Sequence, residues 1–258
     1  MNGTTRSGQW LSIRQPNPRA ALRLFCFPYA GGGARVYSAW PRNLPPSFEV
    51  CAVQLPGRET RLKEQPFREL TPVVEAVAAA IEPYMDRPFA FFGHSMGALI
   101  SFELARLLRE RGRARPAHLF VSGRRAPQLP DEEPPTYDLP DEEFFAILRD
   151  LNGTPTEVLE HPELMELMMP LLRADFALVQ TYVYRPAAPL DCPITAFGGV
   201  QDVEVGREDI KAWREQTADA FSARFLPGDH FFLNHPQTRA VMLSVIAQEL
   251  YHSIGPIT

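Results

Sequence analysis

The stretch FAFFGHSMGALISFELARLLRERG, residues 89–112, carries the pattern that decides the fold. It begins with the apolar run Phe89–Phe92 and places Ser95 at the centre of a G-x-S-x-G pentapeptide. Apolar residues then recur at helical spacing up to Gly112, a residue type that often ends a helix. The pentapeptide alone also fits a serine in an ordinary surface turn. Because a buried strand and an amphipathic helix flank it, we interpret it as a nucleophile elbow, the sharp strand-to-helix turn that exposes a serine hydroxyl.

Short apolar runs alternate with longer segments of helical period along most of the chain. The runs predicted to be strands are Leu22–Phe27, Val50–Gln54, Phe89–Phe92, Leu119–Ser122, Ile194–Phe197 and Phe225–Leu226. The segments predicted to be helices are Val36–Asn43, Leu70–Met85, Met96–Arg111, Arg207–Ala218 and Gln237–His252. This alternation predicts an α/β fold with a mostly parallel central sheet and helices on both faces. In such a sheet the reactive groups lie on loops beyond the carboxyl ends of the strands.

The alternation stops between Arg125 and Leu190. This stretch begins with a proline-rich, acidic segment, continues with the helix-like Phe144–Leu151, and then gives an apolar run, Glu163–Tyr184, interrupted at Pro170. We predict one domain, with core segments at 1–124 and 191–258 and a helical lid insertion, hereafter the lid, at 125–190. The lid is expected to overhang the active-site edge of the sheet and to form an acyl chamber. The alternative is a helical hairpin that only stabilises the domain.

Composition excludes several classes of function. The 258 residues have ordinary fractions of hydrophobic (45%) and charged (22%) side chains, and the net charge of -5 gives no reason to expect nucleic acid binding. Three widely spaced cysteines, Cys26, Cys51 and Cys192, indicate neither a disulfide framework nor a metal site. The N-terminal residues lack the apolar core of a signal peptide, and no apolar stretch is long enough to span a bilayer. We therefore expect a cytoplasmic protein that does not act at a membrane.

A serine hydroxyl needs a base to take its proton and an acid to orient that base. In this fold class the chain order is Ser, then Asp or Glu, then His. His230 fits the base because it lies in GDHFFLNHP, after the strand-like ARFLPG and before the last helix. His235 is the rival, but it resembles the start of that helix.

Asp202 fits the acid because it lies in FGGVQDVEV, a glycine-loosened loop shortly after a predicted strand. Four other acidic residues suit the role less well. Asp191 precedes a strand, and Asp209 lies in a helical pattern. Glu204 would need a different loop path, and Asp229 is better placed to satisfy loop backbone groups.

Hydrolysis through an acyl-serine also needs backbone N–H donors for the oxyanion. The N–H of Met96 is the first candidate, because it follows the nucleophile at a helix N-terminus. The second is expected in the loop PYAGGGA, where Ala30 is preferred and Tyr29 is the alternative. Interpreted as a phosphate cradle, the three glycines of this loop lack the following Lys-Ser or Lys-Thr, so we expect no nucleotide and no other cofactor.

Six blocks together resemble the external, type II thioesterases of polyketide synthases and nonribosomal peptide synthetases, members of the α/β-hydrolase superfamily. The blocks are FPYAGGGA (27–34), VQLPGRE (53–59), GHSMGA (93–98), SGRRAP (122–127), GGVQD (198–202) and LPGDHFFL (226–233). The resemblance implies an enzyme that removes aberrant or stalled acyl groups from the phosphopantetheine arm of acyl or peptidyl carrier proteins, with acyl-CoA as an alternative substrate. Ser95 would be acylated, and His230, oriented by Asp202, would then activate water.

The arginines Arg58, Arg124 and Arg125 have two interpretations. They either contact the phosphate of the arm or an acidic carrier protein, or pair with acidic residues of the lid. Two alternatives to the function itself also stay open at this point. A general carboxylester hydrolase would use the same triad, and a non-catalytic carrier-protein binding module would use the same fold without the chemistry.

Overall fold

The computed structural model describes residues 9–130, 134–151 and 161–255. Within these residues the strands form one seven-stranded sheet of order β1-β3-β2-β4-β5-β6-β7, in which β1 is antiparallel to β3 and the other pairings are parallel. The strands are β1 (Leu11–Ser12), β2 (Leu22–Phe27), β3 (Phe48–Val53), β4 (Phe89–His94), β5 (Leu119–Ser122), β6 (Ile194–Gly199) and β7 (Phe221–Leu226). The predicted α/β class with a mostly parallel sheet is therefore confirmed.

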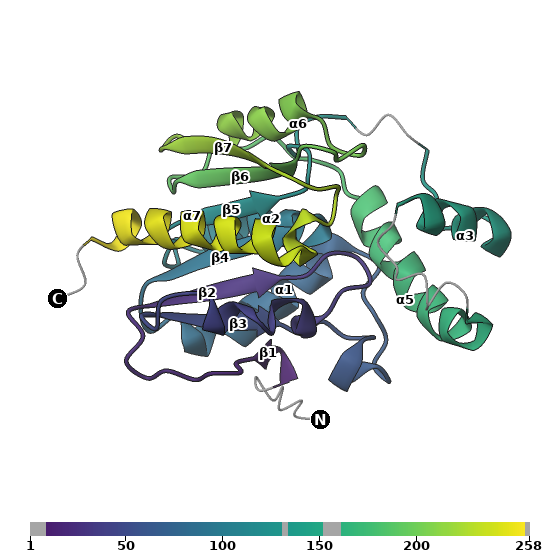
Figure 1. Ribbon diagram of the computed structural model, residues 1–258, viewed down its shortest axis with the longest axis horizontal. Helices are drawn as coiled ribbons and strands as arrows, with labels where there is room; N and C mark the ends of the chain where they lie inside the picture. Colours follow the sequence, from purple (N-terminus) through teal and green to yellow (C-terminus); the bar gives the residue numbers. More distant parts are fainter. Residues whose placement is uncertain (1–8, 131–133, 152–160, 256–258) are drawn as a thin grey trace.

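Helices cover both faces of this sheet, as predicted (Figure 1). One face packs against α1 (Leu70–Ile81), α2 (Met96–Glu110) and α6 (Arg207–Lys211), and the other packs against α7 (Pro236–Ile254). The strands β3 and β4 are buried along their whole length. A strand covered on both faces is mostly apolar, and this is why Val50–Val53 of β3 and Phe89–Phe92 of β4 form continuous hydrophobic runs in the sequence.

One predicted helix is wrong. Residues 36–43 form parts of two short 3-10 turns, η2 (Ala34–Tyr37) and η3 (Trp40–Arg42), instead of an α-helix. Pro41 has no N–H to donate to the carbonyl of Tyr37, so an α-helix here would lose one of its backbone hydrogen bonds. The buried Trp40 and Tyr37 rings pack edge to face at 4.9 Å, and this packing holds the two turns against the sheet.

The lid contains two described helices, α3 (Asp141–Asp150) and α5 (Pro162–Gln180), which lie beyond the end of the sheet (Figure 1). The predicted interruption at Pro170 is wrong, because α5 continues through it. Pro170 is exposed, so water can satisfy the carbonyl of Glu166 that loses its partner. Phe144 and Leu148 of α3 pack against α5 in a small core of their own. The proline-rich entrance is partly outside the described residues. In the described ranges, no helix has the length and apolar character needed to cross a membrane.

Candidate active site

Ser95 lies at the turn between β4 and α2 with φ 52° and ψ -114°, a conformation that non-glycine residues rarely adopt. Its backbone N–H donates to the carbonyl of Ser122 at 2.8 Å, which ties the turn to the neighbouring strand. The flanking glycines leave the room that this turn needs. A Cβ at Gly93 would lie 2.1 Å from the carbonyl oxygen of Gly97, and one at Gly97 would lie 2.0 Å from that of Phe27. The turn therefore has the geometry of a nucleophile elbow.

Asp202 and His230 meet although they come from different loops. Asp202 follows β6, His230 follows β7, and the distance from Asp202 Oδ2 to His230 Nδ1 is 2.9 Å. The Asp202 side chain is 0% exposed, and its Oδ1 accepts the N–H groups of Glu204 and Val205 at 2.9 and 3.1 Å. Asp202 is thus fixed in place, and as the acceptor for Nδ1–H it favours the tautomer in which Nε2 is free to accept a proton.

The rival residues have other roles. His235 occupies the position just before α7, as the sequence indicated, and its side chain makes no capping hydrogen bond there. Asp229 accepts the N–H of Phe231 at 2.9 Å, so it satisfies loop backbone as predicted. Asp209 accepts the N–H of Gly206 at 2.8 Å at the start of α6, and Asp191 is exposed beside Arg115.

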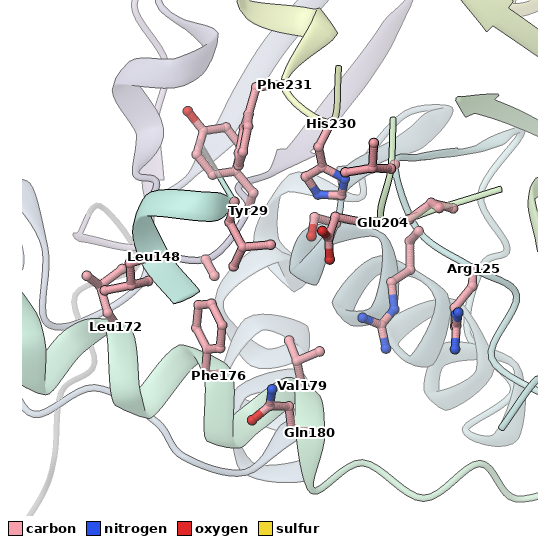
Figure 2. A pocket seen from close by; sticks show the side chains of 17 residues that line it. Tyr29, Arg125, Leu148, Leu172, Phe176, Val179, Gln180, Glu204, His230 and Phe231 are labelled. Atoms are coloured by element: carbon pink, nitrogen blue, oxygen red, sulfur yellow. The ribbon is translucent and has the colours of Figure 1, made fainter. Parts of the chain in front are cut away.

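A cavity of about 410 Å³ joins Ser95 and His230 to the lid. Figure 2 shows His230 and Phe231 on one side of it and the α5 side chains Phe176, Val179 and Gln180 on the other. The lid contributes Leu148, Leu151, Leu172, Phe176, Val179 and Gln180 to the lining. Most of these side chains are apolar, so this wall suits an acyl chain. The insertion is therefore a wall of the cavity as well as a packed helical pair.

The two residues predicted to donate to the oxyanion lie at the start of α2 and in the loop after β2. Met96 is the first residue of α2, where a backbone N–H has no acceptor within its own helix and points along the positive end of the helix dipole. Ala30 follows β2 and lines the same cavity as Ser95. Tyr29, the alternative, also lines the cavity, and its hydroxyl lies 3.3 Å from Asn234 Nδ2, which donates to it.

His94 lies beneath the site and was not assigned a role from the sequence. Its Nδ1 is 2.9 Å from Ser122 Oγ, and its ring centroid is 5.2 Å from that of His230. Burial, with a smaller contribution from the nearby His230, lowers the pKa of His94 well below its usual range. His94 is therefore neutral at pH 7 and places no charge beside a protonated His230. The signal in the sequence was its position between a buried strand and the elbow serine, where the surroundings are apolar.

The three arginines separate into two groups. Arg58 is only 4% exposed and forms a two-pronged ion pair with Asp175 of the lid, at 2.8 Å for each prong. The interpretation of Arg58 as a contact for a carrier protein is therefore wrong, and the alternative of a pair with a lid acid is correct. Arg124 and Arg125 line the cavity, and Arg125 Nη1 donates to the carbonyl of Pro130 at 3.0 Å.

A parallel sheet with a serine at the elbow and an Asp–His pair on the loops beyond its carboxyl edge defines the α/β-hydrolase fold. Residues 22–248 match the family model described as the thioesterase domain, and the chain belongs to this family of thioester hydrolases.

The chain is similar to several thioesterases and to a gramicidin S biosynthesis protein. The gramicidin S biosynthesis protein GrsT of Aneurinibacillus migulanus is 47% identical over 99% of each chain. The thioesterase PikA5 of Streptomyces venezuelae is 41% identical over 88% of this chain and 81% of its own. Among solved structures, the RedJ thioesterase from the prodiginine pathway of Streptomyces coelicolor superposes with a TM-score of 0.86 at 41% identity, covering 92% of this chain and 94% of RedJ.

Proposed function

We propose that this protein hydrolyses acyl thioesters on the phosphopantetheine arm of acyl or peptidyl carrier proteins, and so removes aberrant or stalled acyl groups from a polyketide or nonribosomal peptide assembly line. The observation that carries the proposal is the cavity that joins Ser95 and His230, with Asp202 hydrogen-bonded to the far side of His230. The similarity to a gramicidin S biosynthesis protein and to RedJ supports the choice of carrier-bound substrates.

The proposed reaction has two halves. Ser95 Oγ attacks the thioester carbonyl while His230 Nε2 takes the hydroxyl proton, and collapse of the tetrahedral intermediate breaks the carbon–sulfur bond. A thiol has a pKa of about 8.5, so the arm leaves as a thiolate with little help and is then protonated by His230. In the second half His230 takes a proton from water and the hydroxide attacks the acyl-serine carbonyl. Collapse of this second intermediate breaks the bond between the acyl carbon and Ser95 Oγ, His230 returns the proton to Oγ, and the acid is released.

The backbone donors would act on the oxygen of both tetrahedral intermediates. Backbone N–H groups at Met96 and Ala30 would need little reorganisation as negative charge develops, because donors that belong to the fold are oriented by it. Asp202 would stay ionised throughout and stabilise the protonated form of His230. The apolar lid side chains would hold the acyl chain, which accounts for a cavity of about 410 Å³ next to the nucleophile.

The test is intact-mass analysis of a panel of acyl carrier proteins after incubation with the enzyme. The wild type is expected to convert acylated carriers to the free-thiol form, and Ser95→Ala is expected to leave them acylated. Matched thioester and oxoester substrates of the same acyl chain belong in the same experiment. Faster hydrolysis of the oxoester, or no loss of mass from any carrier, would contradict the proposal and would favour the general ester hydrolase or the binding module.

We further propose that Arg124 and Arg125, on the cavity wall, attract the phosphate of the arm or an acidic carrier surface. Reversing both charges, in Arg124→Glu/Arg125→Glu, is expected to raise the KM for an acylated carrier protein by about tenfold. The KM for a short acyl-pantetheine analogue without the phosphate and the carrier should stay near its wild-type value. Steady-state kinetics on the two substrates measure this difference.

Arg113→Glu is the matched control, because Arg113 is exposed and pairs with Glu82 at 2.9 Å outside the cavity. It should leave both KM values unchanged. An equal rise in KM for carrier and analogue in the double variant would mean that the two arginines shape the cavity and do not recognise the carrier.

We also propose a cytoplasmic location. Cys26, Cys51 and Cys192 are all free and buried. Burial raises the pKa of the Cys51 and Cys192 thiols to about 12, so these groups are unreactive at neutral pH. Unpaired cysteines of this kind are typical of proteins in a reducing compartment.

A further inference from the structure

A single buried carboxylate connects the lid to the loop that carries the proposed oxyanion donor. Asp175 lies on α5 and is 1% exposed. Its Oδ1 accepts from Arg58 Nη2 at 2.8 Å, and its Oδ2 accepts both from Arg58 Nη1 at 2.8 Å and from the backbone N–H of Gly31 at 2.7 Å. Gly31 directly follows Ala30 in the segment 29–33, hereafter the oxyanion loop.

Arg58 holds the same loop from a second side. Its Nη1 donates to the carbonyl of Gly32 at 3.0 Å, and its Nε donates to the carbonyl of Pro56 at 3.2 Å. The N–H of Gly31 and the carbonyl of Gly32 are thus both fixed by the ion pair. Because one backbone N–H and one backbone carbonyl of the oxyanion loop are bonded to this pair, the path of the loop depends on the positions of Asp175 and Arg58.

The residues on both sides of Arg58 have positive φ, and one of them is not a glycine. Gly57 has φ 81°, which a glycine adopts without strain, whereas Glu59 has φ 48°, which is rare for a residue with a side chain. Gln54 Nε2 donates to the carbonyl of Arg58 at 3.0 Å, while Gln54 Oε1 accepts the N–H of Ala34 at 3.2 Å. Such strain persists where the surrounding contacts fix it, and it is concentrated at functional sites.

Stability alone does not explain this arrangement. Removing two charges from water is costly, and well-packed apolar residues of similar volume often stabilise a protein as well as a buried ion pair does. An apolar pair at these positions would leave the N–H of Gly31 without its acceptor. What the ion pair supplies, and an apolar pair does not, is a fixed orientation of the oxyanion loop.

We infer that the Arg58–Asp175 pair is a positioning device that aligns the Ala30 N–H with the reacting carbonyl and makes this alignment depend on the position of α5. The inference rests on the proposed function, in which Ala30 supplies one of the two oxyanion donors. Helix α5 also carries Leu172 and Phe176, which line the cavity. An acyl group that fits against these two side chains leaves the oxyanion loop aligned, and one that displaces α5 misaligns it. Acyl selectivity would then appear in kcat as well as in KM.

The first variant is Asp175→Asn, which keeps the side-chain shape but sets an amide NH2 against an N–H donor of Arg58 or Gly31, so that at least one of the three bonds is lost. Misplacing one of two oxyanion donors is expected to lower kcat on an acyl-pantetheine thioester by about 10- to 100-fold, with KM changed by less than about threefold. The rate at which a fluorophosphonate probe labels Ser95 should fall in parallel. In that reaction negative charge develops on the phosphoryl oxygen of the probe, and the same two backbone N–H groups stabilise it.

Asp141→Asn is the matched control. Asp141 of α3 accepts from Arg173 of α5 at 2.6 Å, so it is also a lid aspartate in an ion pair with an arginine, but its contact stays within the lid. This variant should retain kcat and the labelling rate to within about twofold, because the oxyanion loop is not touched.

The double variant Arg58→Met/Asp175→Leu separates positioning from folding. Without either charge, the Tm should recover from the value of Asp175→Asn toward that of the wild type, while kcat and the labelling rate stay low. Recovery of both Tm and kcat would show that the pair is only structural and would overturn the inference. So would an Asp175→Asn variant whose Ser95 is labelled as fast as in Asp141→Asn. A wild-type Ser95 that does not react would instead overturn the proposed function together with the inference.

Discussion

Replacing Ser95 by alanine is expected to lower kcat for thioester hydrolysis by about 10⁴- to 10⁶-fold, because no acyl-enzyme can form without the hydroxyl. The backbone N–H of residue 95 would still donate to the carbonyl of Ser122, since this bond involves no side-chain atom. Alanine meets the positive φ at this position with about the same strain as serine. The Tm is therefore expected to stay near the wild-type value. Release of free thiol from an acyl-pantetheine substrate measures the rate, and thermal unfolding measures the Tm.

Ser101→Ala is the matched control for this variant. Ser101 is buried in α2 six residues after the elbow, and its Oγ donates to the carbonyl of Ala98 at 3.0 Å. The side chain removed is the same, but it is bonded to its own helix, so kcat should change by less than about threefold. Residual activity in Ser95→Ala above about one hundredth of the wild-type rate would contradict a covalent mechanism at Ser95.

The sequence predicted well those parts of the fold in which the same requirement, burial in the core, acts on many consecutive residues. The boundaries predicted for β2 and β5 agree with the structure, because these strands are covered on both faces and are mostly apolar. The edge strand β7 is partly exposed, so only its last two residues read as a strand. The two-residue β1 is too short to show any period. The extended conformation of β7 and β1 depends on pairing with the neighbouring strands β6 and β3, and the sequence does not reveal this pairing.

The site also has parts that the sequence predicts and parts that it does not. The elbow residues are contiguous, and the loops of Asp202 and His230 each follow a strand of the same parallel sheet, so topology predicts that they meet. The Arg58–Asp175 pair follows from no such rule, because its members are 117 residues apart and one lies in an insertion with its own path. An acidic residue on the apolar side of a helix was a signal for a buried partner, but it did not identify that partner.

Replacing Asp202 by asparagine is expected to lower kcat by about 10³- to 10⁴-fold at pH 7 by selecting the wrong tautomer of His230. The N–H groups of Glu204 and Val205 both point at Oδ1 of residue 202, so the amide oxygen will occupy that side. The amide nitrogen then faces His230 Nδ1, which lies 2.9 Å away in the wild type and must now accept a hydrogen bond. The imidazole proton moves to Nε2, and Nε2 can no longer accept the proton of Ser95.

The loop bonds to residue 202 survive this substitution, so the expected loss is in kcat and not in folding. The Tm of Asp202→Asn should stay within a few degrees of the wild-type value. Asp229→Asn is the control, because Asp229 adjoins His230 in sequence but accepts the N–H of Phe231. It should keep kcat to within about threefold, since an amide oxygen can accept the same bond. If Asp202→Asn and Asp229→Asn reduce kcat equally, the orientation of His230 does not depend on Asp202, and the acid of the proposed triad must be sought elsewhere.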